Sequence, residues 1–157
     1  MGMAMTLQDY LEELDVTYDL VEHPRKYTSL EIADTAHLPA GRLAKGVLVR
    51  GDNGTLTLAV IPSDRMVDLD SLNERLARPV TLASEDDVGR VFDDCDSGAV
   101  PPVGNAYAVH VLLDQRFDAK PEVYFEAGDH EELVHVSGDE FSRLMAGAER
   151  GPFSRAV

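Results

Sequence analysis

The sequence predicts an α+β fold around a mixed β-sheet. Segments with the two-residue periodicity of strands and segments with helical periodicity both occur, but they do not alternate in a regular strand–helix–strand order. Two apolar runs at 43–50 and 55–61 are joined by Gly-Asp-Asn-Gly at 51–54, which indicates an antiparallel hairpin. Together these observations favour a mixed sheet with helices packed on it.

The first part of the chain predicts a helix, a strand and a second helix. A helix is expected over 6–15, where a threonine can cap the first turn and apolar side chains recur at helical spacing. These side chains are Leu7, Tyr10, Leu11 and Leu14. Residues 17–21 alternate as in a strand. Thr28 and Glu31 then form a capping-box pattern, which opens a helix that reaches Ala36.

The remaining elements follow from the same periodicities and from turn residues. In chain order they are a helix at 68–77, a strand at 79–82, a helix at 84–92, strands at 107–113, 122–126 and 133–136, and a helix at 137–146. The tail at 147–157 is small and polar, and we expect it to fray. A length of 157 residues with 44% hydrophobic content indicates a single domain over 1–157.

The charge balance restricts the partners of this chain. The formal net charge is −15. This argues against sequence-independent binding to a nucleic-acid backbone, including DNA, because such binding needs a basic surface. A local site for a short nucleotide end remains compatible with this charge. No stretch approaches the ~18 apolar residues of a membrane helix, and the N-terminus lacks a secretory signal. We therefore expect a cytoplasmic protein that does not contact a membrane.

Lys45 is the first candidate for a functional residue. It lies near the start of the apolar run 43–50, on the face shared by Val47 and Val49. The chain has three lysines against eleven arginines, and a lysine in a core strand is costly unless its ammonium has a partner. A bound phosphate could supply that partner. The alternative is that Lys45 extends its ammonium to solvent.

Two turns are the next candidates. Residues 98–104, Gly-Ala-Val-Pro-Pro-Val-Gly, cannot form regular structure. A rigid loop of this kind could present backbone N–H groups to a carbonyl oxygen, or it could be a stiff connector. Gly128, Asp129 and His130 follow an apolar strand, at a position where binding sites often form. The alternative is an ordinary surface turn.

Other patterns exclude several chemistries. His130 and His135 are five residues apart, which is not the spacing of a zinc-binding helix, and one cysteine adds too little to predict a metal site or a cofactor. Cys95 lies among aspartates that disfavour its thiolate, so it is not expected to be a nucleophile. His23 and Tyr27 could line a pocket or could pack in the core.

Several stretches, taken in order, form a family pattern. They are Val-Glu-His-Pro at 21–24, Tyr-Thr-Ser-Leu-Glu-Ile-Ala at 27–33, Leu-Ala-Lys-Gly-Val-Leu-Val at 43–49, Leu-Ala-Val-Ile-Pro at 58–62, the loop at 98–104, and Val-Tyr-Phe-Glu-Ala-Gly-Asp-His at 123–130. With this order and spacing the chain resembles the YbaK-type aminoacyl-tRNA deacylases, which include the inserted editing domain of bacterial prolyl-tRNA synthetases. The resemblance covers about residues 7–145 and implies the barrel-like mixed sheet of that family, flanked by helices, in a free-standing form.

The resemblance also implies roles for the matched residues. Lys45 would contact the terminal adenosine or its phosphate, and the backbone from Gly98 to Pro102 would hold and polarise the ester carbonyl. The residues expected to bind or enclose the substrate are His23, Tyr27, Thr28, Gly46, Val100, Pro101, Gly104, Gly128, Asp129 and His130. The family is thought to use a ribose hydroxyl of its substrate and no protein nucleophile, which agrees with the absence of an activated serine or cysteine pattern.

The expected function is trans-editing hydrolysis of a mischarged tRNA without a cofactor. Alanine or cysteine on tRNA(Pro) is the expected cargo, because glycine and backbone walls suit a small side chain. The family often has a threonine or serine where this chain has Gly46, so serine and threonine also come within range. The expected partners are the aminoacylated acceptor end and a prolyl-tRNA synthetase. Two alternatives stay open: a non-catalytic module that binds a nucleotide or a tRNA end, and a regulatory partner of a synthetase or another enzyme.

Overall fold

The computed structural model describes residues 2–23, 33 and 38–157. Its helices are α1 (Met5–Glu13), α3 (Leu69–Leu76), α4 (Glu85–Val91) and α5 (Gly138–Leu144), with short 3-10 helices η1 (Ala40–Arg42), η2 (Gly104–Tyr107) and η3 (Gln115–Phe117). Its strands are β1 (Asp19–Glu22), β2 (Leu43–Gly51), β3 (Leu56–Pro62), β4 (Arg65–Val67), β5 (Val80–Leu82), β6 (His110–Asp114), β7 (Glu122–Glu126), β8 (Glu132–Ser137), β9 (Glu149–Gly151) and β10 (Ser154–Ala156). The helix predicted at 28–36, with its capping box of Thr28 and Glu31, lies outside the described residues apart from Ala33.

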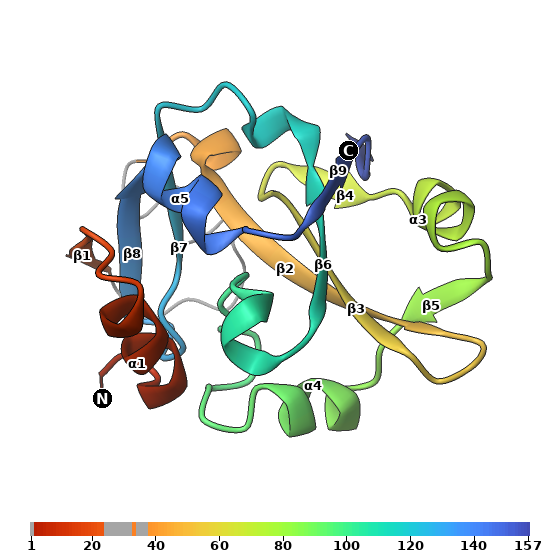
Figure 1. The fold of residues 1–157 in the computed structure, drawn as a ribbon, viewed down its shortest axis with the longest axis horizontal. Helices are drawn as coiled ribbons and strands as arrows, with labels where there is room; N and C mark the ends of the chain where they lie inside the picture. The colour runs from red at the N-terminus through yellow and green to blue at the C-terminus, as the bar shows by residue number, and fades with distance from the viewer. Residues whose placement is uncertain (1, 24–32, 34–37) are drawn as a thin grey trace.

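One mixed sheet of eight strands organises the fold (Figure 1). Its order is β1-β8-β7-β2-β3-β6-β9, and β5 pairs with β2 beside this path. β2 runs antiparallel to β3 and β5 but parallel to β7, and β6 runs parallel to both β3 and β9. α5 packs against β7 and β8, α3 packs beside β5, and α4 follows β5 at the lower edge in Figure 1. The predicted α+β class with a mixed sheet is therefore confirmed.

The hairpin predicted at 51–54 is also confirmed. Lys45 on β2 pairs with Ile61 on β3. The turn closes where the N–H of Gly54, a residue with a φ of +84°, donates to the carbonyl of Gly51 at 2.9 Å. Leu48 belongs to the main buried cluster. Lys45 lies three residues earlier on the same strand, so its side chain leaves the opposite face of β2.

The predicted threonine cap of the first helix is wrong, because α1 begins at Met5 after Ala4 and has no side-chain cap. The three later predicted helix starts that the structure describes agree with the observed caps. Ser84 and Asp87 form a capping box at α4, Asp68 accepts a hydrogen bond from the N–H of Ser71 at the start of α3, and Ser137 caps α5. Each cap satisfies N–H groups that the first helical turn leaves without an intrahelical partner. Over the described ranges, no helix has the length and the apolar composition that crossing a membrane requires.

The prediction that the tail at 147–157 frays is wrong. β9 pairs in parallel with β6, and β10 pairs with β4, a strand that was not predicted from the sequence. Phe153 anchors this segment: it is 1% exposed and packs in the same buried cluster as Leu72 of α3. The guanidinium of Arg75 lies 5.1 Å from the centre of the Phe153 ring. A single buried aromatic side chain thus holds an otherwise polar tail in place.

Two strand boundaries also differ from the prediction. The strand expected at 107–113 begins at residue 110, because the chain first forms η2, which ends at Ala108 in the left-handed conformation with a φ of 56°. The first strand lies at 19–22, where the predicted range was 17–21. The N–H of Thr17 donates to the Glu140 carboxylate at 2.7 Å, so this residue is held by α5. The irregular conformation predicted for the segment from Gly98 is confirmed up to the start of η2.

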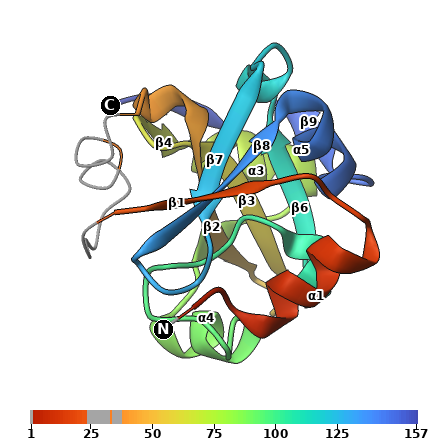
Figure 2. The ribbon, with the colours of Figure 1, turned by 90° about the vertical axis from the view of Figure 1, so that its left-hand side faces the viewer.

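The chain before α1 lies against the turn between β7 and β8 (Figure 2). There the N–H of Ala4 donates to the carbonyl of Ala127 at 2.9 Å. The N–H of Asp96, in the loop after α4, donates to the carbonyl of Gly128 in the same turn at 2.8 Å. The turn between β7 and β8 therefore joins the N-terminus to the loop that leads to Gly98.

Candidate functional site

A cavity of about 290 Å³ lies where β2, the segment from β5 to α4, the loop at 98–100 and the end of β7 meet. We call it the Lys45 cavity. Its walls include Lys45, Gly46, Leu82, Gly98, Val100 and Glu126. The cavity therefore contains one cationic side chain, Lys45, and two acidic side chains, Glu85 and Glu126, together with glycine and apolar surface.

Lys45 is half-buried in this wall. Burial lowers the pKa of its ammonium group, and the negative charge of Asp64 offsets part of that effect. Loss of water around an ammonium disfavours its charged form, so an anion entering the cavity would restore favourable interactions. Lys45 is thus suited to bind a phosphate or another anion.

Gly46 contributes backbone to the same wall, but it does not leave an empty space on the core side. A Cβ atom built there would lie 3.0 Å from Cδ1 of Leu58. Leu58 is fully buried in the main cluster. The room that the sequence suggested at Gly46 is therefore largely filled by Leu58.

The loop at 98–104 divides into two parts. Gly98, with a φ of 80°, and Val100 line the Lys45 cavity. Pro101 and Pro102 are buried behind it. Gly104 begins η2 and packs under β6, where an added Cβ would lie 2.3 Å from a methyl group of Val111. The prolines and Gly104 therefore hold the loop in position, while Gly98 and Val100 form its surface toward the cavity.

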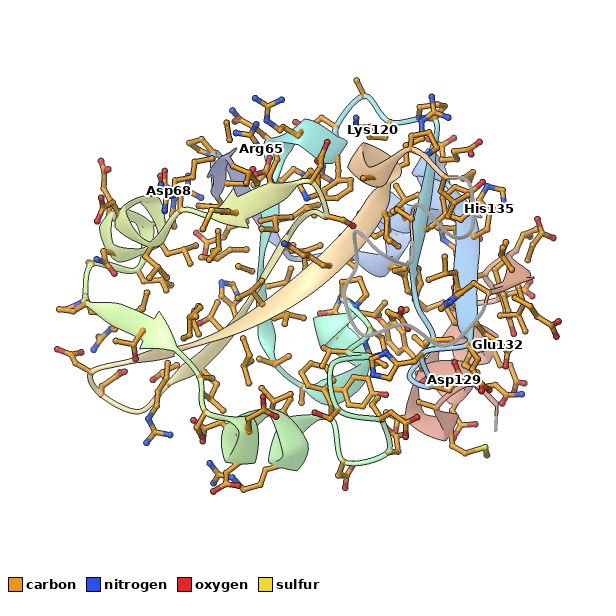
Figure 3. The ribbon with its side chains drawn as sticks, turned by 180° about the vertical axis from the view of Figure 1, so that it is seen from behind. Arg65, Asp68, Lys120, Asp129, Glu132 and His135 are labelled. Atoms are coloured by element: carbon orange, nitrogen blue, oxygen red, sulfur yellow. The ribbon has the colours of Figure 1, made fainter. Side chains whose placement is uncertain are left out.

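The turn after β7 is buried and braces that loop. Gly128 has a φ of +109°, and a Cβ there would lie 2.9 Å from Ala4. An Asp129 carboxylate oxygen accepts the N–H groups of Glu131 and Glu132 at 3.0 and 2.9 Å. Asp129 is 1% exposed, so the alternative of an ordinary surface turn is wrong. Figure 3 shows Asp129 near Glu132, at the end of the β7–β8 hairpin away from Lys120.

His130 connects the turn directly to the loop. Its Nε2 hydrogen-bonds to the carbonyl of Ser97, and because a carbonyl only accepts, Nε2 must carry the proton. His130 is 1% exposed and has a φ of 63°. Gly128, Asp129 and His130 do not line the Lys45 cavity; their contacts place its Gly98 wall.

Glu126 is a site residue that was not predicted from the sequence. It ends β7, is 5% exposed and lines the Lys45 cavity. His23 is buried beside it, with Nε2 4.0 Å from Oε1 of Glu126. Burial, together with the negative charge of Asp129, raises the pKa of Glu126 to about 8, although the backbone N–H of His130 lowers it in part. The expected pocket residues Tyr27 and Thr28 lie outside the described residues.

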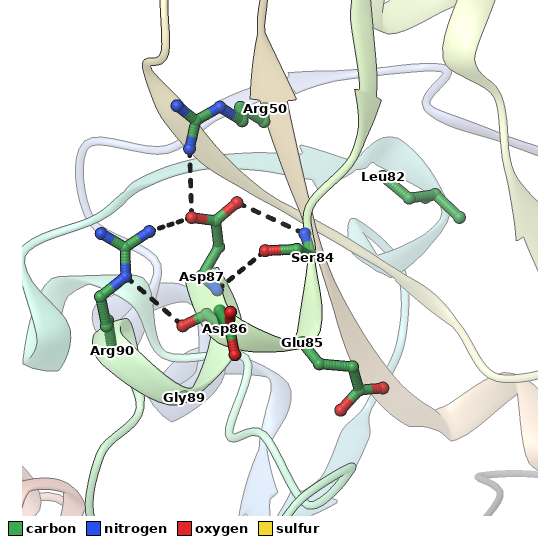
Figure 4. Close-up of a pocket in the computed structure, with 8 residues that line it drawn as sticks. All are labelled: Arg50, Leu82, Ser84, Glu85, Asp86, Asp87, Gly89 and Arg90. Atoms are coloured by element: carbon green, nitrogen blue, oxygen red, sulfur yellow. Dashed lines mark hydrogen bonds and ion pairs between the residues drawn. The ribbon is translucent and has the colours of Figure 1, made fainter.

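An open hollow of about 800 Å³ adjoins the Lys45 cavity and shares Leu82 and Glu85 with it (Figure 4). Arg50 and Arg90 both contact Oδ1 of Asp87 there. Burial alone would raise the pKa of Asp87, but hydrogen bonds from Ser84 and the charge of Arg50 lower it. This cluster therefore holds the start of α4 against β2.

The cysteine is in its unreactive form. Burial is the main cause that raises the pKa of the Cys95 thiol to about 12, and the charges of Asp94 and Asp93 add to it, while a hydrogen bond with Tyr107 opposes them. This confirms that Cys95 is not a poised nucleophile. Across residues 2–23, 33 and 38–157, the structure contains no group of three or more His, Cys, Asp or Glu side chains arranged to hold a metal ion.

The fold and the cavity define a small α+β protein with a half-buried lysine beside a glycine–proline loop. Residues 23–144 match the aminoacyl-tRNA editing domain family. This is more than half of the chain, and the chain belongs to that family.

Individual relatives agree with this assignment. The chain is 25% identical over 141 residues to the prolyl-tRNA editing protein ProX of Acetoanaerobium sticklandii, over 86% of this chain and 85% of that protein. The crystal structure of hypothetical protein APE2540 superposes with a TM-score of 0.84 at 23% identity, covering 96% of this chain and 99% of the other. The crystal structure of a candidate trans-editing enzyme for prolyl-tRNA synthetase superposes with a TM-score of 0.83 at 24% identity, covering 98% of this chain and 97% of the other. These two likenesses confirm the fold.

Proposed function

We propose that this protein is a free-standing deacylase that hydrolyses the ester bond of a mischarged tRNA. The observation that supports this most directly is the Lys45 cavity, where a half-buried ammonium lies beside the Gly98 loop in a member of the editing family. The name of the ProX relative suggests tRNA(Pro) as the acceptor. A deacylase of this kind acts where tRNA is charged and used, so we place it in the cytoplasm.

In this proposal each wall of the cavity has one task. Lys45 binds the terminal adenosine or its phosphate by charge. The backbone of the Gly98 to Pro102 segment holds the ester carbonyl and stabilises the negative charge that develops on its oxygen. Water adds to the carbonyl carbon, the ester C–O bond breaks, and the ribose oxygen leaves with a proton. The neighbouring ribose hydroxyl of the substrate assists, so the protein needs no nucleophile of its own, and positioning supplies much of the rate.

The small cavity suggests the cargo. A pocket discriminates a missing or added methylene by only about 1–3 kcal/mol, which is why a synthetase for proline needs a second site that removes smaller residues. Alanine and cysteine fit the expected size class, and Leu58 already fills the space on the core side of Gly46. We expect alanyl-tRNA(Pro) and cysteinyl-tRNA(Pro) to be the best substrates.

The test is a panel of tRNA(Pro) molecules charged with Ala, Cys, Ser, Thr or Pro, mixed with the pure protein and assayed for ester loss over time. We expect rapid loss of alanine and cysteine, slower loss of serine and threonine, and retention of proline. Cleavage of none of the five, with tRNA binding intact, would instead favour a non-catalytic binding module. Equal cleavage of prolyl-tRNA would argue against proofreading.

A further inference from the structure

Glu126 occupies an unusual position for a carboxylic acid. It is 5% exposed at the end of β7 and lines the Lys45 cavity. Within the described part of the chain, neither of its carboxyl oxygens has a hydrogen-bond partner within 3.5 Å. Buried carboxyl groups are normally hydrogen-bonded or paired, because an unsatisfied buried oxygen is costly. A group that remains unsatisfied at the wall of a cavity is suited to a ligand that completes its bonds.

The charged groups around Glu126 indicate the charges that a ligand of this cavity should carry. His23 lies behind the carboxyl at 4.0 Å, Asp129 adds negative charge, and the backbone N–H of His130 points toward it. Lys45 and Glu85 belong to the cavity wall. Among the described residues no ion pair joins Lys45 to Glu126, and the charge that acts on Lys45 is that of Asp64. Of the two acidic side chains in the wall, Glu85 is exposed and accepts a hydrogen bond from Ser97, whereas Glu126 is buried. The cavity therefore has a cationic group and a separate buried acidic group.

We infer that Glu126 binds the α-amino group of the aminoacyl ester, so that the enzyme recognises a free amine in addition to a small side chain. This inference rests on the proposed function. An aminoacylated tRNA end has the matching charges: phosphate beyond the adenosine and an ammonium on the amino acid. With the phosphate end at Lys45, the amine can meet Glu126, and the ester between them lies along the Gly98 wall.

Binding of the amine also changes the protonation state of Glu126. Burial and Asp129 keep the Glu126 carboxyl protonated at neutral pH. When an ammonium enters and pairs with the carboxylate, the carboxyl proton passes to solvent, and no covalent bond changes. A buried, charge-assisted hydrogen bond of this kind contributes about 1.5–3 kcal/mol, which corresponds to roughly 10- to 150-fold in affinity.

The first test compares alanyl-tRNA(Pro) with N-acetyl-alanyl-tRNA(Pro), and each rate is normalised to the uncatalysed hydrolysis of the same ester. We expect the native enzyme to prefer the free amine by about 10-fold or more, chiefly through KM. Glu126→Gln keeps the shape of the side chain but removes the acid, so the preference should fall close to one. Glu122→Gln, on the same strand but outside the cavity, is the matched control and should keep the preference.

A second measurement does not depend on activity. Calorimetry with the stable amide analogue 3′-alanylamino-3′-deoxyadenosine, in two buffers of different ionisation enthalpy, reports proton release on binding. We expect release by the native protein, no release by Glu126→Gln, and weaker binding of the N-acetylated analogue to the native protein. If the native enzyme cleaves neither tRNA, the proposed function fails, and calorimetry still decides the role of Glu126. Equal KM values and equal affinities for free and acetylated amines in the native protein would overturn the inference while leaving deacylation intact. That comparison stands even if the variant does not fold.

Discussion

The Nε2 atom of His130 donates a hydrogen bond to the main-chain carbonyl of Ser97. This bond joins the turn after β7 to the residue that precedes Gly98. Since Gly98 lines the Lys45 cavity and His130 does not, a side chain outside the cavity determines where one of its walls lies. The position of the loop is thus coupled to the packing of the β7–β8 hairpin.

Replacing His130 should therefore weaken both the fold and the activity. His130→Asn tolerates the left-handed backbone at this position but is too short to reach the Ser97 carbonyl. We expect a loss of about 1–3 kcal/mol in the free energy of unfolding, because a buried group loses its partner. Urea denaturation measures this, and deacylation should slow as the Gly98 wall shifts. His110→Asn, at an exposed ion pair with Glu149, is the control and should have little effect. Equal losses in both variants would contradict the bracing role.

Lys45→Ala should abolish deacylation without unfolding the protein. Removing a partly desolvated ammonium relieves a burial cost, so thermal stability should hold or rise. The rate on mischarged tRNA should fall on the order of 100-fold or more, as for other preorganised charge contacts. Lys120→Ala is the matched control, since Lys120 lies at the other end of the β7–β8 hairpin from Asp129 (Figure 3). Loss of activity together with unfolding would show that Lys45 is a structural residue.

Glu126 should make stability depend on pH. Its pKa rises from an ordinary value of 4.5 to about 8 in the fold. Between these values the folded state binds the proton more tightly than the unfolded state, so the free energy of unfolding contributed by Glu126 falls as pH rises. This contribution is complete below pH 4.5 and is lost above pH 8.

Glu126→Gln removes this pH-dependent contribution. Relative to the native protein, the variant should become progressively more stable from about pH 5 to about pH 9, as measured by denaturant unfolding at each pH. Comparison of the two proteins cancels the titration of the other carboxylates. A constant difference across this range would mean that Glu126 has an ordinary pKa.

The segment that contains Phe153 and the C-terminal strands should be required for the stability of the fold. Phe153→Ala empties a buried site between α3 and the sheet, and we expect a loss of about 3–5 kcal/mol in the free energy of unfolding. Arg155→Ala, at an exposed residue of β10 just after Phe153, should change stability by less than about 0.5 kcal/mol. A Phe153 variant as stable as the native protein would indicate that the tail contributes nothing to the core.

Features set by neighbouring residues could be predicted from the sequence. The Gly51–Gly54 turn, the capping box of Ser84 and the irregular backbone after Gly98 all depend on local conformational preferences. Lys45 could be selected for the same kind of reason, because a rare lysine in an apolar strand is conspicuous in the sequence itself.

Other features depend on residues that are distant in the sequence and could not be predicted in this way. Glu126 is the last residue of an apolar strand, a position that surface residues often take, and the packing of the β7–β8 hairpin near the Gly98 loop buries its carboxyl. The tail contains no strand signal beyond Phe153, and its pairing with β4 and β6 becomes favourable only once those strands exist. Sequence periodicity and turn residues thus determined most of the helices and strands, and the scarcity of lysine in an apolar strand indicated Lys45. The tertiary structure decided which side chains line the cavity, because burial and charge pairing depend on contacts between segments far apart along the chain.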